Sequence, residues 1–547
     1  MLISLHRKSY CRSHGFFPFT HIALIPFTHI ILTPMNRKLY SGYRMPYLFL
    51  ITLLIIAMTT DSRAEGAASG PDDAPPSFAR LLYDTYDTYR EPSLNHRRFK
   101  HHDIVPLIRK LGGHPDITLV QEGYSTEGRE IFRLTMGTGD IQVLLWSQMH
   151  GNEPTATMAL FDMFHFLTAD DAFNDVRAEI LEKITIHAVP MLNPDGSERY
   201  QRRTAFGIDM NRDARQLQAP ESQILKRLRD ETDADFGFNL HDQSIRYSAG
   251  STPKSTVIAF LAPAFDEERS INPVRERSMR LIAQLDHMLR EFIPGHVATY
   301  SDTFEPRAFG DNIQKWGTST ILVESGGLKG DPEKQYIRKM NYLLLLESFR
   351  SIARGRYGNF TVEQYEAIPA NRLRLHSIIF RNLTVPFREY AFQLDLAVNR
   401  VEVNINGATD FYKRGSVSEL GDLSTFDGFE EVDATGMRVD SGRVYPDIFA
   451  TEKELERVDA LALLRGGFTA VRVEEPSEGR YTDFPLNIIG PTARQPSGFQ
   501  IGRPANLILR RGDEVVYAVI NGFLVDVAGA LSAGEALQDV GNALIYR

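Results

Sequence analysis

The stretch IQVLLWSQMHGNEP, residues 141–154, sets the pattern for the first half of the chain. Its first part, 141–147, is an almost continuous apolar run, which is typical of a strand covered by helices on both faces of a sheet. A polar turn with His150 follows, and Pro154, a residue preferred at the first position of a helix, marks the next element. The stretch therefore predicts a buried strand, a sharp turn and a helix.

The same order of strand and helix recurs over residues 79–356. Apolar runs such as 184–192 alternate with helical patterns, and the segment 273–293 has its apolar residues at three-to-four spacing. This alternation predicts an α/β fold, in which helices pack on both faces of a sheet. Residues 357–547 differ, because short alternating stretches are separated by Gly, Asp and Asn. We expect a smaller, mostly-β C-terminal domain there, whose role the sequence leaves open.

Composition narrows the possible functions. The chain has 547 residues with 61 basic and 70 acidic side chains, and its net charge of −9 argues against a nucleic-acid binder. Its only cysteine, Cys11, excludes a disulfide framework and a multi-cysteine zinc module. Any metal ion must therefore bind to His, Asp or Glu.

Residues 1–64 have the pattern of a secretory signal peptide with an upstream extension. Basic residues precede the apolar run 45–58, and a small-x-small cleavage site ends at Ala64. The run is shorter than the roughly twenty residues that a membrane-spanning helix needs. We expect cleavage near Ala64, a linker at 65–78, and a secreted or periplasmic protein. The alternatives are an uncleaved membrane anchor and a start site downstream of Met1.

Three side chains suited to metal binding follow two of the predicted strands. His150 and Glu153 lie on the tight turn after 141–147, and His241 ends the strand-like run 236–240. Ligands of open α/β sheets bind beyond the carboxyl ends of the strands, so we expect the three side chains to meet at one edge. Two His and one carboxylate match a catalytic zinc site. Taken singly, His150 is more simply a hydrogen-bonded residue at a strand end, and Glu153 a carboxylate favoured by a helix start.

A polar segment between these candidates offers groups that bind anions. It runs from a turn signal at 193–196 through an arginine pair at 202–203 to Asn211 and Arg212. An amide donor beside a planar guanidinium suits a substrate carboxylate, and a separate arginine near a metal suits an oxyanion. In isolation, each of these short motifs is more often part of a solvated surface loop.

A glutamate ends a further apolar run. Glu324 follows residues 318–323 and precedes a serine and two glycines. It either caps the strand at the surface or serves as the general base that takes a proton from metal-activated water.

In their order along the chain, these motifs resemble zinc carboxypeptidases of the carboxypeptidase A type, over about residues 80–353. The resemblance implies an α/β/α sandwich around a mixed, mainly parallel eight-stranded sheet. It implies that one Zn²⁺ ion is bound by His150, Glu153 and His241. It further implies that Arg203 polarises the scissile carbonyl and that Glu324 is the base.

The resemblance also assigns residues around the metal and the substrate. Asp209 would hydrogen-bond His150 and fix its tautomer. Asn211 and Arg212 would hold the terminal carboxylate of the substrate. Arg307 lies in the stretch that shapes side-chain preference in this family, where it would favour an acidic terminal residue; the simpler alternative is a surface-loop arginine.

The predicted function is that of a zinc metallocarboxypeptidase, which hydrolyses the last peptide bond of a substrate with a free C-terminal carboxylate. Two alternatives stay open. One is a zinc-dependent amide deacylase or a hydrolase of peptidoglycan stem peptides. The other is an inactive, peptidase-like binding protein. No nucleic-acid partner is expected, and membrane contact is expected only if the signal segment is uncleaved.

Overall fold

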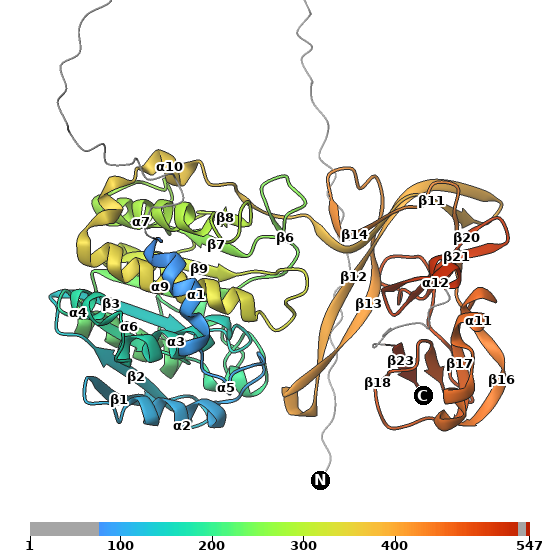
Figure 1. Cartoon of the computed structure of the whole chain (residues 1–547), viewed down its shortest axis with the longest axis horizontal. Coiled ribbons are helices and arrows are strands. Elements are labelled where there is room, and N and C mark those ends of the chain that lie inside the picture. Colours follow the sequence, from blue (N-terminus) through green and yellow to red (C-terminus); the bar gives the residue numbers. More distant parts are fainter. Residues whose placement is uncertain (1–75, 534–542) are drawn as a thin grey trace, which may run out of the picture. The chain divides into compact units, whose positions relative to one another are not determined.

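The structure, a computed structural model, describes residues 76–533 and 543–547 (Figure 1). The predicted signal segment at 1–64 and nearly all of the predicted linker at 65–78 lie outside the described residues. Within the described ranges, no helix is both long enough and apolar enough to cross a membrane.

A mixed eight-stranded sheet forms the centre of the first half. Its strands are β1 (Ile117–Tyr124), β2 (Glu130–Met136), β3 (Ile141–Ser147), β4 (Ile184–Val189), β5 (Phe236–Asp242), β7 (Ile258–Leu261), β8 (Val297–Thr299) and β9 (Ser319–Ser325). They follow the order β1-β2-β4-β3-β5-β9-β7-β8. The central strands β4, β3, β5 and β9 run parallel, whereas β1, β2 and β7 each make antiparallel pairs. The predicted α/β fold with a mixed, mainly parallel sheet is confirmed.

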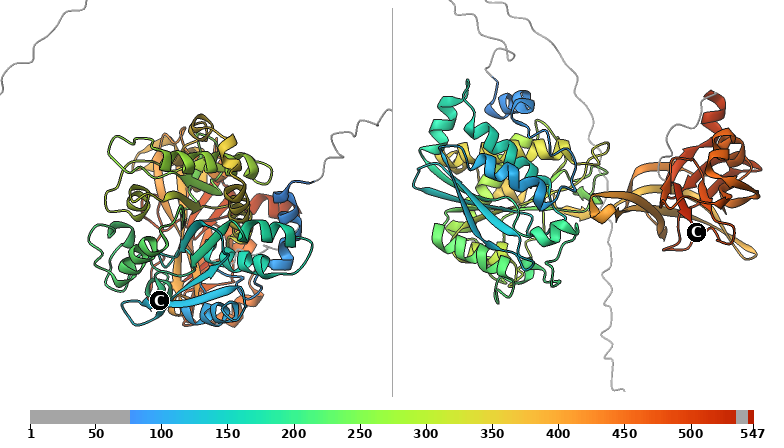
Figure 2. Two further views of the ribbon diagram at one scale, coloured as in Figure 1. Left: turned by 90° about the vertical axis from the view of Figure 1, so that its left-hand side faces the viewer. Right: turned by 90° about the horizontal axis from the view of Figure 1, so that it is seen from below.

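Helices pack around this sheet (Figures 1 and 2). They are α1 (Phe78–Tyr89), α2 (His101–Leu111), α3 (Thr155–Thr168), α4 (Asn174–Leu181), α5 (Pro194–Glu198), α6 (Pro220–Thr232), α7 (Pro273–Leu289), α8 (Phe309–Lys315), α9 (Gln335–Arg354) and α10 (Val362–Glu366). Successive side chains along a strand point to opposite faces of the sheet, and each face packs in its own apolar layer. Leu145 and Phe238 pack in a core with residues of α3, α7 and α9, while Leu144 and Trp146 pack with residues of α6 and α8. This alternation determines which layer each strand residue faces.

The helix predicted at 273–293 is α7, and it ends at Leu289 rather than at Ile293. Its start is fixed by Asn272, whose side chain accepts a hydrogen bond from the Arg275 backbone N–H. Beyond Leu289 the chain continues in hydrogen-bonded turns, in which the Phe292 and Ile293 backbone N–H groups donate to the Leu289 carbonyl. The apolar face predicted from the spacing is buried against the sheet.

The turn predicted at 193–196 is the start of the short helix α5. The Asn193 side chain accepts a hydrogen bond of 2.9 Å from the Gly196 backbone N–H and so caps this helix. The Gly196 backbone lies directly against Gly151, where an added Cβ would be 2.0 Å from the Gly196 carbonyl carbon. The turn between His150 and Glu153 therefore needs glycine at position 151.

The second half is rich in strands, as predicted. One eight-stranded sheet contains β11 (Leu375–Phe387), β12 (Tyr390–Ile405), β13 (Asp410–Gly421), β14 (Asp427–Asp433), β15 (Arg438–Ser441), β20 (Leu507–Arg511), β21 (Glu514–Ile520) and β22 (Phe523–Asp526). A five-stranded sheet contains β16 (Arg443–Thr451), β17 (Phe468–Glu475), β18 (Tyr481–Thr482), β19 (Asn487–Ile489) and β23 (Ala543–Tyr546). Two short helices, α11 (Ala460–Arg465) and α12 (Val527–Ala533), accompany them.

The two halves are joined by more than the covalent chain. The short strand β10 (Asn371–Leu373) pairs with β6 (Tyr247–Ala249) of the first half. Tyr365 and Ile368 still pack in the first apolar core, about ten residues beyond the boundary predicted at 356/357. That boundary stays a prediction.

Candidate active site

The candidate site lies where the parallel strands β3, β5 and β9 end. His241 on β5 and Glu324 on β9 are directly paired in the parallel register. Their side chains point to the same face of the sheet as those of Trp146 and Asn239, the face covered by α6 and α8. The turn after β3 carries His150 and Glu153 to the same edge. Three strand ends thus bring together residues that lie up to 174 positions apart in the sequence.

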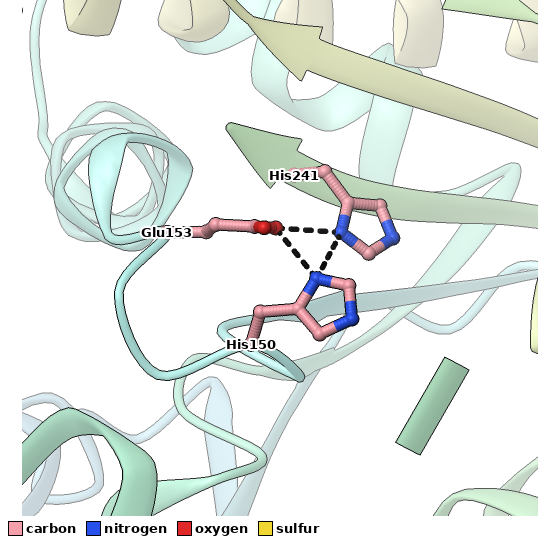
Figure 3. Close-up of side chains that lie close together, drawn as sticks. All are labelled: His150, Glu153 and His241. Carbon is pink, nitrogen blue, oxygen red and sulfur yellow. Dashed lines mark hydrogen bonds and ion pairs between the residues drawn. The ribbon is translucent and has the colours of Figure 1, made fainter. Parts of the chain in front are cut away.

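The two histidines and Glu153 point at one another (Figure 3). Glu153 Oε2 lies 2.9 Å from His150 Nδ1 and 2.7 Å from His241 Nδ1, and the two Nδ1 atoms are 3.2 Å apart. All three side chains are buried. Burial alone would raise the pKa of Glu153, but the charges and hydrogen bonds of the histidines hold it well below its usual range. The carboxylate is therefore ionised, as a metal ligand must be.

This donor set fits a divalent metal ion. The two Nδ1 atoms and the carboxylate oxygen lie within 4.8 Å of one another. Tetrahedral zinc, with bonds of about 2.0–2.2 Å, separates its ligand atoms by about 3.3–3.6 Å, so these atoms need to move apart by only about half an ångström. The predicted convergence of His150, Glu153 and His241 is found in the structure.

Asp209, to which the resemblance assigned a hydrogen bond with His150, lies behind the cluster. Its Oδ1 lies 3.2 Å from His150 Nε2, the ring nitrogen that points away from the cluster. The same oxygen accepts a hydrogen bond of 3.0 Å from the Asn211 backbone N–H. A carboxylate on Nε2 favours the tautomer that leaves Nδ1 free to bind a metal.

The arginine that reaches the cluster is Arg202, which sequence reasoning did not select. Its terminal nitrogen is 3.0 Å from His150 Nδ1 and 3.3 Å from Glu153 Oε1, and its Nε donates to Asp209 at 2.9 Å. The Arg203 side chain instead donates to the Gly207 carbonyl at an exposed position. The structure thus places Arg202 with the three metal-binding candidates and Arg203 away from them.

Asn211 and Arg212 lie on the short 3₁₀ helix Met210–Arg212 beside the start of α8. The Asn211 side-chain oxygen accepts a hydrogen bond from the Phe309 backbone N–H. Arg212 Nε lies 3.1 Å from a carboxylate oxygen of Glu305. Glu305 also accepts two hydrogen bonds from the exposed side chain of Arg307. Glu305, which the sequence reasoning overlooked, is therefore shared by the two arginines proposed to contact substrate.

Glu324 has the environment of a proton-transfer group. Its Oε2 atom is buried and has no hydrogen-bond partner among the described residues. Burial, followed by the negative charges of Glu153 and Asp242, raises the pKa of Glu324 well above its ordinary value. A carboxylate held in this way takes up a proton more readily than one on the surface.

Residues 104–251 match the family model for zinc carboxypeptidase. The predicted resemblance to zinc carboxypeptidases is confirmed. The matched segment contains the three metal-binding candidates together with Asp209, Asn211 and Arg212. Glu324 lies outside it and is brought to the site by strand pairing.

Curated relatives align over a limited part of the chain. An uncharacterised protein of Zymomonas mobilis is 32% identical over 152 residues, which cover 27% of this chain and 38% of that protein. "Probable carboxypeptidase 2" of Arthroderma benhamiae is 28% identical over 149 residues, which cover 26% of this chain and 27% of that protein. The chain therefore spans well under half the length of these relatives.

Among solved structures, a metallo-carboxypeptidase from Burkholderia cenocepacia aligns with a TM-score of 0.38 and 17% identity, and the alignment covers 49% of this chain and 71% of that one. A metallo-carboxypeptidase from Pseudomonas aeruginosa, in complex with (2-guanidinoethylmercapto)succinic acid, aligns with a TM-score of 0.39, 16% identity and the same coverage.

Proposed function

We propose that the protein is a zinc-dependent metallocarboxypeptidase, which removes the C-terminal residue of peptides. The observation that carries this proposal is the convergence of His150, Glu153 and His241 beside the register-paired Glu324. Two imidazoles and one carboxylate leave a zinc ion with an open position for water and substrate. The family match over 104–251 supports the same assignment.

The residues of this chain divide the chemistry among them. Bound to the three ligands, zinc would supply Lewis acidity, which polarises a carbonyl and acidifies water. Glu324 would accept the proton from the attacking water and later deliver it to the leaving amine. Arg202, whose guanidinium borders the cluster, would stabilise the negative charge that develops on the carbonyl oxygen.

The predicted substrate carboxylate would bind at Arg212. This guanidinium is paired with the carboxylate of Glu305, so a substrate carboxylate would replace Glu305 as its partner. A substrate anchored there by its last carboxylate would present its terminal peptide bond to the cluster. We therefore propose exopeptidase rather than endopeptidase activity.

The test combines Glu324→Gln with two forms of one substrate. We expect wild-type protein to release the last residue of a peptide with a free C-terminus and to leave the C-terminally amidated form intact. Glu324→Gln should keep its zinc, measured by atomic absorption, and lose about 10³-fold or more in kcat. Near-normal turnover by this variant, or equal cleavage of both peptides, contradicts the proposal.

A location outside the cytoplasm also remains our proposal, on the basis of residues 45–64 alone. N-terminal sequencing of the protein from its native host tests it. The expected first residue lies just after Ala64, and an intact N-terminal segment contradicts cleavage.

A further inference from the structure

A cavity of about 370 Å³ is lined by residues from both halves of the chain. One wall consists of residues that directly follow the site: Ile245 comes after His241, and the loop 327–334 comes after Glu324. The other wall comes from the β-rich half and includes Arg400, Glu402 and Lys413. A cavity of this size accommodates one or two amino-acid side chains.

Lys334 joins the cavity to the active-site edge. It lines the cavity, and its ammonium lies 3.0 Å from Asp242 Oδ2 and 2.9 Å from the Ser325 carbonyl. Asp242 and Ser325 are the residues next to His241 and Glu324, so their side chains face the opposite side of the sheet. The proposed carboxylate clamp at Arg212 lies on the α8 side instead. A peptide whose C-terminus is held at Arg212 would therefore extend its amino-terminal part away from α8, toward the cavity.

Buried ion pairs hold the β12–β13 hairpin in place at this cavity. Glu402 on β12 accepts one hydrogen bond from Arg97 at 2.7 Å and another from Arg98 at 2.8 Å. The arginine side chains are only 8% and 3% exposed. Near the hairpin tip, the Lys100 ammonium donates to the Ala408 carbonyl at 2.8 Å. Both arginines are buried and share one carboxylate, whose loss would leave two buried charges without this partner, so the wall is a built feature of the fold.

One charge in the cavity has no direct ion pair within the described part of the chain. Lys413 on β13 stands directly opposite Glu402 in the strand register, but Arg97 and Arg98 occupy both Glu402 oxygens. Across 76–533 and 543–547, the Lys413 ammonium makes no hydrogen bond or ion pair. Arg400, its neighbour in the cavity, is paired with Glu430 at 2.7 Å. Burial lowers the pKa of Lys413, which indicates that its charge is incompletely solvated.

We propose that this cavity is a substrate subsite, in which Lys413 pairs with an acidic side chain on the amino-terminal side of the scissile bond. Glu402 and Glu333 attract the half-buried ammonium only from beyond ion-pair distance, and a substrate carboxylate in the cavity would give it a direct ion pair. The β-rich half then has a role in the reaction, because it completes the binding site for the peptide. This inference rests on the proposed carboxypeptidase function and adds the class of substrate.

The test measures binding separately from turnover. Zinc-loaded Glu324→Gln protein is titrated by calorimetry with N-acetylated pentapeptides that carry Glu or Gln at the second, third or fourth position from a free C-terminus. At one of these positions we expect the Glu peptide to bind about five- to tenfold more tightly than its Gln counterpart. Adding Lys413→Gln should abolish this difference, and adding Lys413→Arg should retain it.

The neighbouring residue supplies the matched control. Arg414 lies on the same strand, is exposed and faces the other side, so Arg414→Gln should leave the preference for Glu intact. A preference that survives Lys413→Gln, or no preference at any of the three positions, overturns the subsite. Turnover of the same peptides by the wild-type protein reports on the carboxypeptidase proposal alone, so the two proposals fail independently.

Discussion

Replacement of Arg202 by Gln should remove most of the activity, whereas the same replacement of Arg203 should not. The Arg202 guanidinium contacts His150 Nδ1, Glu153 Oε1 and Asp209 Oδ2, at 3.0, 3.3 and 2.9 Å. Loss of one oxyanion donor costs about 10²–10³-fold in kcat, or about 2.7–4 kcal/mol of transition-state stabilisation. The Arg202 side chain is 42% exposed, so its ion pairs should add less than about 1 kcal/mol to the free energy of unfolding.

The two effects can therefore be separated by experiment. Release of the terminal residue gives kcat/KM, zinc analysis reports on the cluster, and urea unfolding gives stability. For Arg202→Gln we expect retained zinc, nearly unchanged stability and a fall in kcat/KM of at least about 100-fold. Arg203→Gln should stay within about twofold of wild type, because its exposed side chain donates to the Gly207 carbonyl and not to the metal-binding candidates. Equal losses in both variants, or normal activity of Arg202→Gln, would refute the reasoning.

Three further outcomes follow from the site. Glu305→Gln should lower KM for peptides with a free C-terminus by up to about fivefold without changing kcat. The reason is that the substrate carboxylate no longer has to displace Glu305 from Arg212, and a raised KM would contradict this. Removal of metal by a chelator should lower the thermal midpoint of the wild-type protein but not that of His241→Ala. If the free metal concentration was near 1,000 times Kd before removal, the wild-type protein should lose about 4 kcal/mol of unfolding free energy. Asp311 titrates in the folded state with a pKa raised to about 6, first by burial and then by the charge of Glu305. Because its pKa is higher in the folded than in the unfolded state, protonated Asp311 stabilises the fold below about pH 4. This contribution, about 3 kcal/mol of the free energy of unfolding, is lost as the pH rises through about 6. Asp311→Asn should remove that loss, and urea unfolding at pH 4 and pH 7 measures it.

Much of the fold could be predicted from local pattern. The apolar run at 141–147 and the helical spacing at 273–293 each depend on residues close together in sequence. Both elements form, although the helix ends at Leu289. The sequence predicts only a turn where the short helix α5 forms, because Asn-Pro-Asp-Gly is compatible with a turn and with a helix start. In the folded chain this helix packs its Gly196 backbone against Gly151. Element ends depend on caps and neighbouring packing, which periodicity does not record.

The sequence by itself determined which chemistry is available: imidazoles and carboxylates rather than thiols, placed at the ends of apolar strands, with Glu324 after the last of them. Only the tertiary structure decided which groups meet. Adjacent residues such as Arg202 and Arg203 are alike in sequence, yet the loop turns one guanidinium to the metal ligands and the other to solvent. Likewise, Arg97 and Arg98, some three hundred residues earlier, hold both oxygens of Glu402, the residue opposite Lys413 in the strand register. Local sequence determines the backbone conformation that each segment prefers and the charges it carries. Long-range packing determines where each side chain points and which group it pairs with.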